Sequence, residues 1–206
     1  MGVLDRIGNE VGDLGDRIGV DFMRYNPIAF KRFDEMGVND APVIVRALRS
    51  YFPAANRVID VGAGSGAFAA ECRRQGLEVT GIERSRHGRR YAAKRHSIEV
   101  LPFDLADEPP AKVTGPFDLA YCLEVAEHVP EGLADRLVSF LCGLAPTIVF
   151  TAASPGQGGT GHINEQPPSY WTERFRALGC EQIDFDFDFE GLSPHWAKTN
   201  ILAFTQ

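Results

Sequence analysis

Residues 58–69 read VIDVGAGSGAFA: an apolar run with one acid, Asp60, followed by glycines at 62, 64 and 66. The run has the composition of a buried strand, and the residues after the last glycine are compatible with a helix. Glycine has no Cβ and tolerates φ values that other residues avoid, so a ligand can approach this turn closely. Unpaired N–H groups at the helix start would face that ligand. The stretch therefore predicts a strand, a turn and a helix around a pocket for a nucleotide-like molecule.

Glycine spacing alone does not define the ligand. Gly62, Gly64 and Ala67 also satisfy the dinucleotide pattern G-x-G-x-x-G/A. The next predicted strand, EVTGIE, ends in Glu83, about 20 residues past the glycines, where an acid can accept hydrogen bonds from ribose hydroxyls. This leaves a dinucleotide and another adenosyl compound as alternatives.

Two further predicted strands also end in polar residues. SIEVLPFDL places Asp104 near its end, and FDLAYCLEVAEHV ends in a cluster of two acids and a histidine. Together, VIDVGAGSG, GIE, FDL and FDLAYCLEVAEH resemble the consecutive motifs of class I S-adenosylmethionine (SAM)-dependent methyltransferases. The resemblance spans roughly residues 40–205.

The resemblance implies a three-layer, Rossmann-like α/β fold, with a mostly parallel seven-stranded sheet that ends in an antiparallel hairpin. Alternating strand and helix patterns after residue 57 agree with it, as do QIDFDFDF and AKTNILAF around the turn GLSP. By resemblance, the methionine part of SAM would lie against the glycine turn. The ribose, the adenine and the sulfonium would lie against the ends of later strands. The residues that this assigns to the cofactor are Asp60, Gly62, Ala63, Gly64, Glu83, Asp104, Leu105 and Leu123.

Length and composition fit one such domain. The chain has 206 residues, and 44% of them are hydrophobic, which suits a single α/β unit with a full core. We expect an N-terminal helical cap at 1–50 and a SAM-binding methyltransferase domain at 51–206, in one structural unit. A dehydrogenase would normally need more residues to bind and orient a hydride partner.

Net charge argues against general affinity for nucleic acid. The formal charge is −7, whereas such binding depends on neutralising phosphates. The basic stretch RSRHGRRYAAKRH at 84–96 is then the solvated face of a helix, or alternatively a local anion or RNA contact. The four cysteines show no C-x-x-C pair and indicate buried thiols. With no membrane-length apolar run, we expect a soluble, cytoplasmic protein.

The N-terminal region has helical periodicity. Residues 1–24 repeat apolar side chains every three or four positions, which favours a helix packed on its own domain, with a lid or a dimer contact as alternatives. The segment NPIAFKRFDEMGVNDAPVIVRALRSYF predicts two helices separated by the turn formers from Gly37 to Pro42. Phe30 and Phe33 in it, and Tyr25 before it, could line a site, but aromatic residues at this spacing are more often part of the core.

The cluster after the fourth strand offers metal ligands. The EVAEH segment resembles the E-x-x-E-H element of small-RNA 2′-O-methyltransferases and ubiquinone-pathway O-methyltransferases, where it can bind a divalent cation. A helical turn would bring its three polar side chains to one side, although the proline at 130 opposes helical geometry before it. We expect a later histidine as fourth ligand, for Mg²⁺ or Mn²⁺. The candidate ligands are Glu124, Glu127, His128 and His162.

Two other interpretations remain for the histidines. His162 could act as a metal-free general base, with His128 at the sulfonium side, which makes these two the candidate catalytic residues. Alternatively, both only brace loops. His162 lies in a glycine-rich loop at 154–166 that could be a pliable lid or a plain connector. After it, Pro167 and Pro168 begin a predicted helix, in which Trp171, Phe175 and Leu178 are expected to face the core.

These observations predict a SAM-dependent methyltransferase that acts on an oxygen of a small molecule, with nitrogen less favoured. A cation-dependent RNA ribose 2′-O-methyltransferase is one alternative, although the longer motif of the RNA enzymes around the histidine is missing. A non-catalytic SAM- or nucleotide-binding module is another. The oligomeric state has no signal in the sequence.

Overall fold

The computed structural model describes residues 27–113, 115–185 and 200–206. The predicted helix at 1–24 and the residue Tyr25 lie outside these ranges, as do the predicted turn GLSP at 191–194 and the adjoining parts of the two predicted strands. The α-helices are α3 (Pro27–Tyr51), α4 (Ala67–Arg74), α5 (Arg86–His96), α6 (Ala134–Leu144) and α7 (Pro168–Ala177). The strands are β1 (Arg57–Val61), β2 (Glu78–Glu83), β3 (Val100–Pro102), β4 (Leu119–Cys122), β5 (Thr147–Phe150), β6 (Glu181–Ile183) and β7 (Leu202–Thr205).

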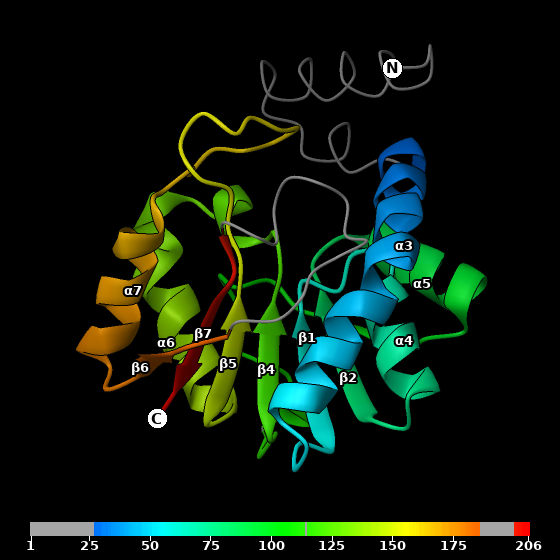
Figure 1. The fold of residues 1–206 in the computed structure, drawn as a ribbon. Helices are drawn as coiled ribbons and strands as arrows, with labels where there is room; N and C mark the ends of the chain where they lie inside the picture. The colour runs from blue at the N-terminus through cyan, green and yellow to red at the C-terminus, as the bar shows by residue number, and fades with distance from the viewer. Residues whose placement is uncertain (1–26, 114, 186–199) are drawn as a thin grey trace.

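The strands form one sheet in the order β3-β2-β1-β4-β5-β7-β6 (Figure 1). Strands β1 to β5 pair in parallel, whereas β7 pairs antiparallel with both β5 and β6. The predicted fold class, a mostly parallel seven-stranded sheet closed by an antiparallel pair, is confirmed. Parallel order places the carboxyl ends of β1, β2, β4 and β5 at one edge, where ligands bind in open α/β sheets.

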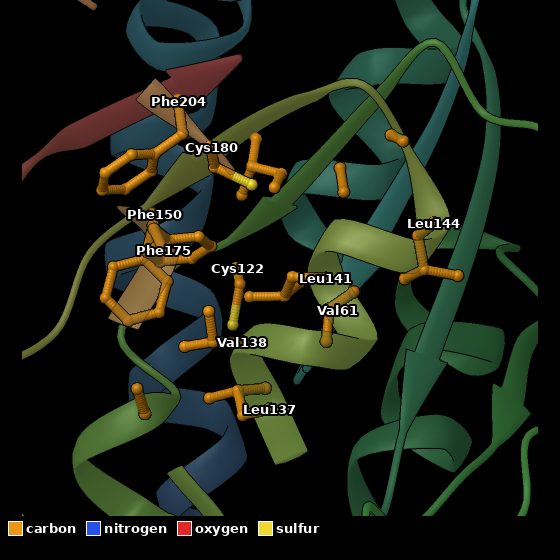
Figure 2. Packing of buried hydrophobic residues seen from close by; sticks show 14 of the residues in the cluster. Val61, Cys122, Leu137, Val138, Leu141, Leu144, Phe150, Phe175, Cys180 and Phe204 are labelled. Carbon is orange, nitrogen blue, oxygen red and sulfur yellow. The ribbon is translucent and has the colours of Figure 1, made fainter. Parts of the chain in front are cut away.

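Helices cover both faces of the sheet and make it the middle of three layers (Figure 1). On one face, α6 and α7 pack against alternate strand residues such as Ile59 and Phe150. Figure 2 shows this cluster, in which the ring of Phe204 in β7 stacks on Phe175 of α7, with 4.0 Å between centroids. On the other face, α3 and α4 pack against the intervening residues, including Tyr121. Alternation along each strand thus builds two cores.

The prediction of two helices before the sheet is wrong. Residues 27–51 form one continuous helix, α3, with Pro42 inside it. Tertiary packing explains this, because Ile44 and Leu48 after the proline are buried against the sheet. Gly37 allows a close approach to α4, since a Cβ built there would lie 3.0 Å from Cβ of Ala67. Gly37, one of the residues that indicated a turn, therefore serves helix packing.

Other local predictions have mixed outcomes. Helix α4 ends before Gly76, whose φ is +86°, as expected of a glycine stop. In α7, Trp171 and Phe175 are buried as predicted, but Leu178 is 48% exposed because the helix ends at Ala177. The periodic pattern continued one residue beyond the element.

The four cysteines are free thiols: Cys142 is partly exposed, and the others are buried. Their Sγ atoms include one close pair, Cys142 and Cys180, 2.9 Å apart. None of the helices within the described ranges has the length and apolar character that crossing a membrane requires.

Candidate functional site

The turn after β1 is held by its neighbour strand. The N–H groups of Gly62 and Ala63 both donate to the carbonyl oxygen of Ile82 in β2, at 2.9 Å. Gly62, Gly64 and Gly66 have φ values of +83°, +52° and +81°, which are left-handed conformations that favour glycine. Helix α4 follows directly, so its N-terminal N–H groups face the carboxyl edge of the sheet.

Other elements pack against this turn closely. A Cβ on Gly62 would overlap the side chain of Val125, which belongs to the segment after β4. A Cβ on Gly88 in α5 would lie 2.7 Å from the carbonyl oxygen of Gly64 and 2.8 Å from the ring of Phe30 in α3. Phe30 is 2% exposed, so the core interpretation of this aromatic is confirmed. The glycine turn thus contacts α5 and the EVAEH segment, and α5 in turn contacts α3.

Asp60, at the end of β1, is 5% exposed, and its Oδ2 atom has no hydrogen-bond partner among the described residues. Burial raises its pKa to about 7, against a smaller opposite effect of the Tyr121 hydroxyl. Tyr121 is the register partner of Asp60 in β4. An unpartnered buried carboxylate is costly, and a cationic or hydrogen-bond-donating ligand would satisfy it.

Glu83, the last residue of β2, is tied to the glycine turn. Its Oε2 accepts from the N–H of Gly64 at 3.1 Å, and its Oε1 accepts from the N–H of Ser85 at 2.5 Å. Burial is the main cause that raises the pKa of Glu83, and these two N–H groups act against it. The side chain therefore lies beside the turn, as its predicted role requires.

The remaining candidates for the cofactor lie at neighbouring strand ends. Asp104, two residues beyond β3, accepts from the N–H of Ala106 at 3.0 Å and lies 3.8 Å from the Arg84 guanidinium. Leu105 packs at the edge of the core on the α6 side. Leu123 directly follows β4 and packs at the edge of the opposite core. The fold places all three at the carboxyl side of the sheet.

The EVAEH segment is not the helical turn that was expected. Glu124 has a left-handed φ of +55°, and its N–H donates to Oγ1 of the buried Thr151 at 2.8 Å. Only Ala126–His128 is helical, as a short 3-10 turn. The chain takes this left-handed conformation at Glu124 before the 3-10 turn begins, so the i, i+3, i+4 geometry does not hold for this residue. The turn ends at Val129, in extended geometry before the proline at 130.

Three of the four proposed ligands converge. One ligand atom from each of Glu127, His128 and His162 lies within 4.8 Å of the others, whereas Glu124 is not part of this mutual group. The Nε2 atom of His162 is 3.9 Å from Oε1 of Glu127, which is too long for a hydrogen bond. The two imidazole rings cross at 75° with centroids 5.0 Å apart.

The carboxylates in this cluster are strongly buried. Glu127 is fully buried, and neither of its carboxylate oxygens has a hydrogen-bond partner among the described residues; the same holds for Oε1 of Glu124. Burial raises the pKa of Glu127 well above its ordinary range, and the nearby Glu124 charge adds to this. Burial also raises the pKa of Glu124. Buried carboxylates beside two imidazoles are the donor set that divalent cations use, so these residues fit a metal ion.

The loop at 154–166 arches over the carboxyl ends of β4 and β5 (Figure 1) and is extensively hydrogen-bonded. The N–H groups of Ile163 and Asn164 both donate to the carbonyl oxygen of Glu127, at 2.9 and 3.0 Å. At the other end, Ser154 Oγ donates to Oδ1 of Asn200 at 2.9 Å. These contacts bring His162 beside a segment 34 positions earlier in the chain.

Two residues of the site were not anticipated from the sequence. Thr151 holds the backbone of Glu124. Glu165 accepts from Nδ1 of His162 at 2.8 Å. A threonine at a strand end and an acid three residues after a histidine are common patterns, so neither carried a distinguishing signal.

Comparison with known proteins adds a family assignment. Over residues 38–144, just over half of the chain, the sequence matches the model of a family described as a methyltransferase domain. The ubiquinone biosynthesis O-methyltransferase of Alkalilimnicola ehrlichii is 39% identical over 132 residues, which cover 62% of this chain and 48% of that protein. The chain spans between a third and half of the length of the curated relatives that it matches.

Solved structures support the fold. Human N-acetylserotonin methyltransferase, in complex with SAM, superposes with a TM-score of 0.64 at 14% identity, over 98% of this chain and 64% of that chain. The methyltransferase domain of bacterial CtHen1-CN superposes with a TM-score of 0.61 at 19% identity, over 83% of this chain and 100% of that chain. At these low sequence identities, the structural similarity shows a shared fold and nothing more.

Proposed function

Because the chain belongs to the class I SAM-dependent methyltransferase family, we propose that it is an enzyme that transfers a methyl group from SAM to an oxygen of a small-molecule acceptor. One observation carries this proposal. The glycine turn and the cluster of Glu127, His128 and His162 lie at the same sheet edge, joined by the contact between Gly62 and Val125. A donor held by the turn would therefore meet an acceptor activated by the cluster.

The proposed cofactor site uses the residues at the carboxyl ends of β1 to β4. The unpartnered Oδ2 of Asp60 suits the ammonium group of the methionine moiety, which would lie along Gly62, Ala63 and Gly64. Glu83 would accept from the ribose hydroxyls with the lone pairs that its two backbone N–H bonds leave. The adenine would lie against Asp104 and Leu105, and the sulfonium against Leu123.

Methyl transfer from a sulfonium is an in-line displacement: the acceptor oxygen forms a bond to the methyl carbon, the carbon–sulfur bond breaks, and S-adenosylhomocysteine leaves. Alignment is the main contribution of the protein. The acceptor O–H gains reactivity when its proton is withdrawn. The carboxylate and histidine cluster supports an oxygen acceptor on this ground, with nitrogen as the second candidate.

We propose two ways in which the cluster could assist. In one, Glu127, His128 and His162, with Glu124 as a fourth ligand, would hold Mg²⁺ or Mn²⁺, and the ion would supply positive charge that lowers the pKa of an acceptor hydroxyl. In the other, no metal is involved, and Nε2 of His162 takes the acceptor proton while His128 lies at the sulfonium side. The buried carboxylate oxygens of Glu127, which have no hydrogen-bond partner within the described part of the chain, favour the first.

The metal dependence of wild-type turnover separates these proposals, and His162→Ala tests both of them. Release of S-adenosylhomocysteine should be measured for wild type and variant, with catechols, phenols and sugars as acceptors, in chelator and with added Mg²⁺ or Mn²⁺. The cation proposal expects wild-type turnover to fall in chelator and return with metal, and the variant to be inactive in both. The base proposal expects chelator to have no effect on wild type. Full activity of the variant would contradict both.

Two alternatives have their own tests. A cation-dependent RNA ribose 2′-O-methyltransferase would bind RNA in a salt-sensitive gel shift, which the net charge of −7 disfavours. A non-catalytic module would bind a nucleotide without turnover. Calorimetry with SAM, S-adenosylhomocysteine and NAD distinguishes the cofactor, and binding of NAD alone would contradict our assignment.

The partners and the location follow as proposals. We propose a small-molecule acceptor, no nucleic-acid partner and a cytoplasmic location, and we make no proposal for the oligomeric state. The division into a helical cap at 1–50 and a catalytic domain at 51–206 also stays a prediction. The contact of Phe30 with Gly88, beside the glycine turn, supports a capping role for α3.

A further inference from the structure

We propose that Glu165 is a positioning residue for His162: its carboxylate binds the Nδ1 proton and thereby orients Nε2 toward Glu127. This inference rests on the proposed function in that a fixed Nε2 serves either as a metal ligand or as a proton acceptor. Glu165 would then belong to the site without touching the reacting atoms, because it acts through His162.

The carboxylate of Glu165 is saturated with donors from its own loop. Its Oε1 accepts from the N–H of Gly158 at 2.7 Å and from Nδ1 of His162 at 2.8 Å, and its Oε2 accepts from the N–H of Gly156 at 2.8 Å. Both carboxylate oxygens already accept from backbone N–H groups, so the side chain acts as an acceptor, and the proton between Glu165 and His162 is assigned to Nδ1.

The position of this proton determines the chemistry of the ring. With Nδ1 protonated, the lone pair of a neutral imidazole is on Nε2, the atom 3.9 Å from Oε1 of Glu127. His128 is held in the same manner, since its Nδ1 donates to the carbonyl oxygen of Gly161 at 3.0 Å. Gly159 has no room for a side chain, because a Cβ there would overlap the ring of His162. The loop thus packs closely against the imidazole ring of His162 and restricts its orientation.

The loop has other attachments that do not involve Glu165. Main-chain bonds join Ile163 and Asn164 to Glu127, and Ser154 joins Asn200. Removing the Glu165 carboxylate should therefore affect the ring of His162 more than the path of the loop. A carboxylate that orients a metal-binding histidine contributes typically about 10- to 100-fold to metal affinity.

The test uses two variants and a matched control. Glu165→Ala removes all three acceptor contacts, and Glu165→Gln keeps the length of the side chain but removes its charge. Ser154→Ala removes a brace of the same loop that does not touch His162. Two quantities are measured: Mn²⁺ affinity by electron paramagnetic resonance, and the tautomer of His162 by long-range ¹H–¹⁵N NMR of ¹⁵N-histidine protein. The His162 signals are assigned by their loss in His162→Asn.

We expect wild type and Ser154→Ala to share one Mn²⁺ affinity and one Nδ1–H tautomer. Both Glu165 variants should bind Mn²⁺ about 10- to 100-fold more weakly, and Glu165→Ala should show a mixture of tautomers. An unchanged tautomer in Glu165→Ala would overturn the proposal, as would an equal loss of affinity in Ser154→Ala. If wild type binds no Mn²⁺ while the tautomer still depends on Glu165, the cation proposal fails and the positioning role stands.

Discussion

Gly62 and Val125 are in direct contact across the site, and no Cβ fits between them. Gly62 belongs to the turn after β1, and Val125 to the segment that carries Glu124, Glu127 and His128. The proposed cofactor turn and the acid and histidine cluster are therefore one packed unit. A change on either side of this contact should reach the other.

Substitution of Gly62 tests the contact. Gly62→Ala should destabilise the protein through both the left-handed φ of +83° and the overlap with Val125, whereas Gly76→Ala meets a similar φ of +86° but open space. We expect Gly62→Ala to lower the free energy of unfolding by about 1–3 kcal/mol more than Gly76→Ala, the usual effect of overpacking. Urea denaturation of both variants measures this. Equal losses would mean that the contact is not tight.

Asp60 should make the stability of the cofactor-free protein depend on pH. Its folded pKa of about 7 lies above the ordinary value of 3.8, so the folded state holds a proton that the unfolded chain releases between these values. The contribution of Asp60 to stability is therefore lost as pH rises from about 4 to about 7. The unfolding free energy of Asp60→Asn minus that of wild type should grow across this window and level off above it. A pH-independent difference would contradict the assignment.

Replacing Glu127 should make the folded protein more stable and weaken its binding of a metal ion. Glu127→Gln removes a buried charge whose carboxylate oxygens have no hydrogen-bond partner among the described residues. Since burial raises the pKa of Glu127, the gain should be larger at pH 9 than at pH 6, and we expect about 1–3 kcal/mol at the higher pH. Added Mn²⁺ should raise the melting temperature of wild type but not of the variant. Glu131→Gln, at an exposed carboxylate nearby, is the control and should change neither property.

Asp34 anchors the cap helix to α5. Its side chain is 4% exposed and pairs with His96 and, at 3.6 Å, with Arg95. Asp34→Ala should lower the unfolding free energy by about 3–5 kcal/mol, because Asp34 and His96 form a largely buried pair. Glu35→Ala removes an exposed pair with Lys31 on the same helix and should cost under about 1 kcal/mol. Urea denaturation compares them, and similar effects of the two variants would argue against an anchor.

Much of the fold could be predicted because local chemistry and packing agree. The strand, glycine turn and helix at 58–69 are specified by an apolar run and by φ values that favour glycine. The antiparallel pair at the sheet edge was predicted from alternation and from the family resemblance. In contrast, α3 was predicted as two helices, since Gly37 and Pro42 are turn formers locally. Their effect is overridden by burial against the sheet and α4, which only the tertiary structure reveals.

The candidate site was predictable in composition more than in geometry. His162 could be placed near Glu127 because both follow strands whose carboxyl ends meet at one sheet edge. The left-handed backbone conformation of Glu124 could not be predicted, since it has no sequence signature and its N–H group is held by the hydroxyl of Thr151. Glu165 was missed for a related reason. Its partners, two glycine N–H groups and a histidine, converge only when the loop is folded.

The loop at 154–166 is attached to Glu127 through main-chain atoms, because the N–H groups of Ile163 and Asn164 both donate to the carbonyl oxygen of Glu127. Mutation can therefore replace the carboxylate without dismantling the architecture around it. During the divergence of related proteins, the side chain at position 127 could therefore change, and with it the proposed chemistry at the acceptor, while the main-chain bonds that hold the loop are kept.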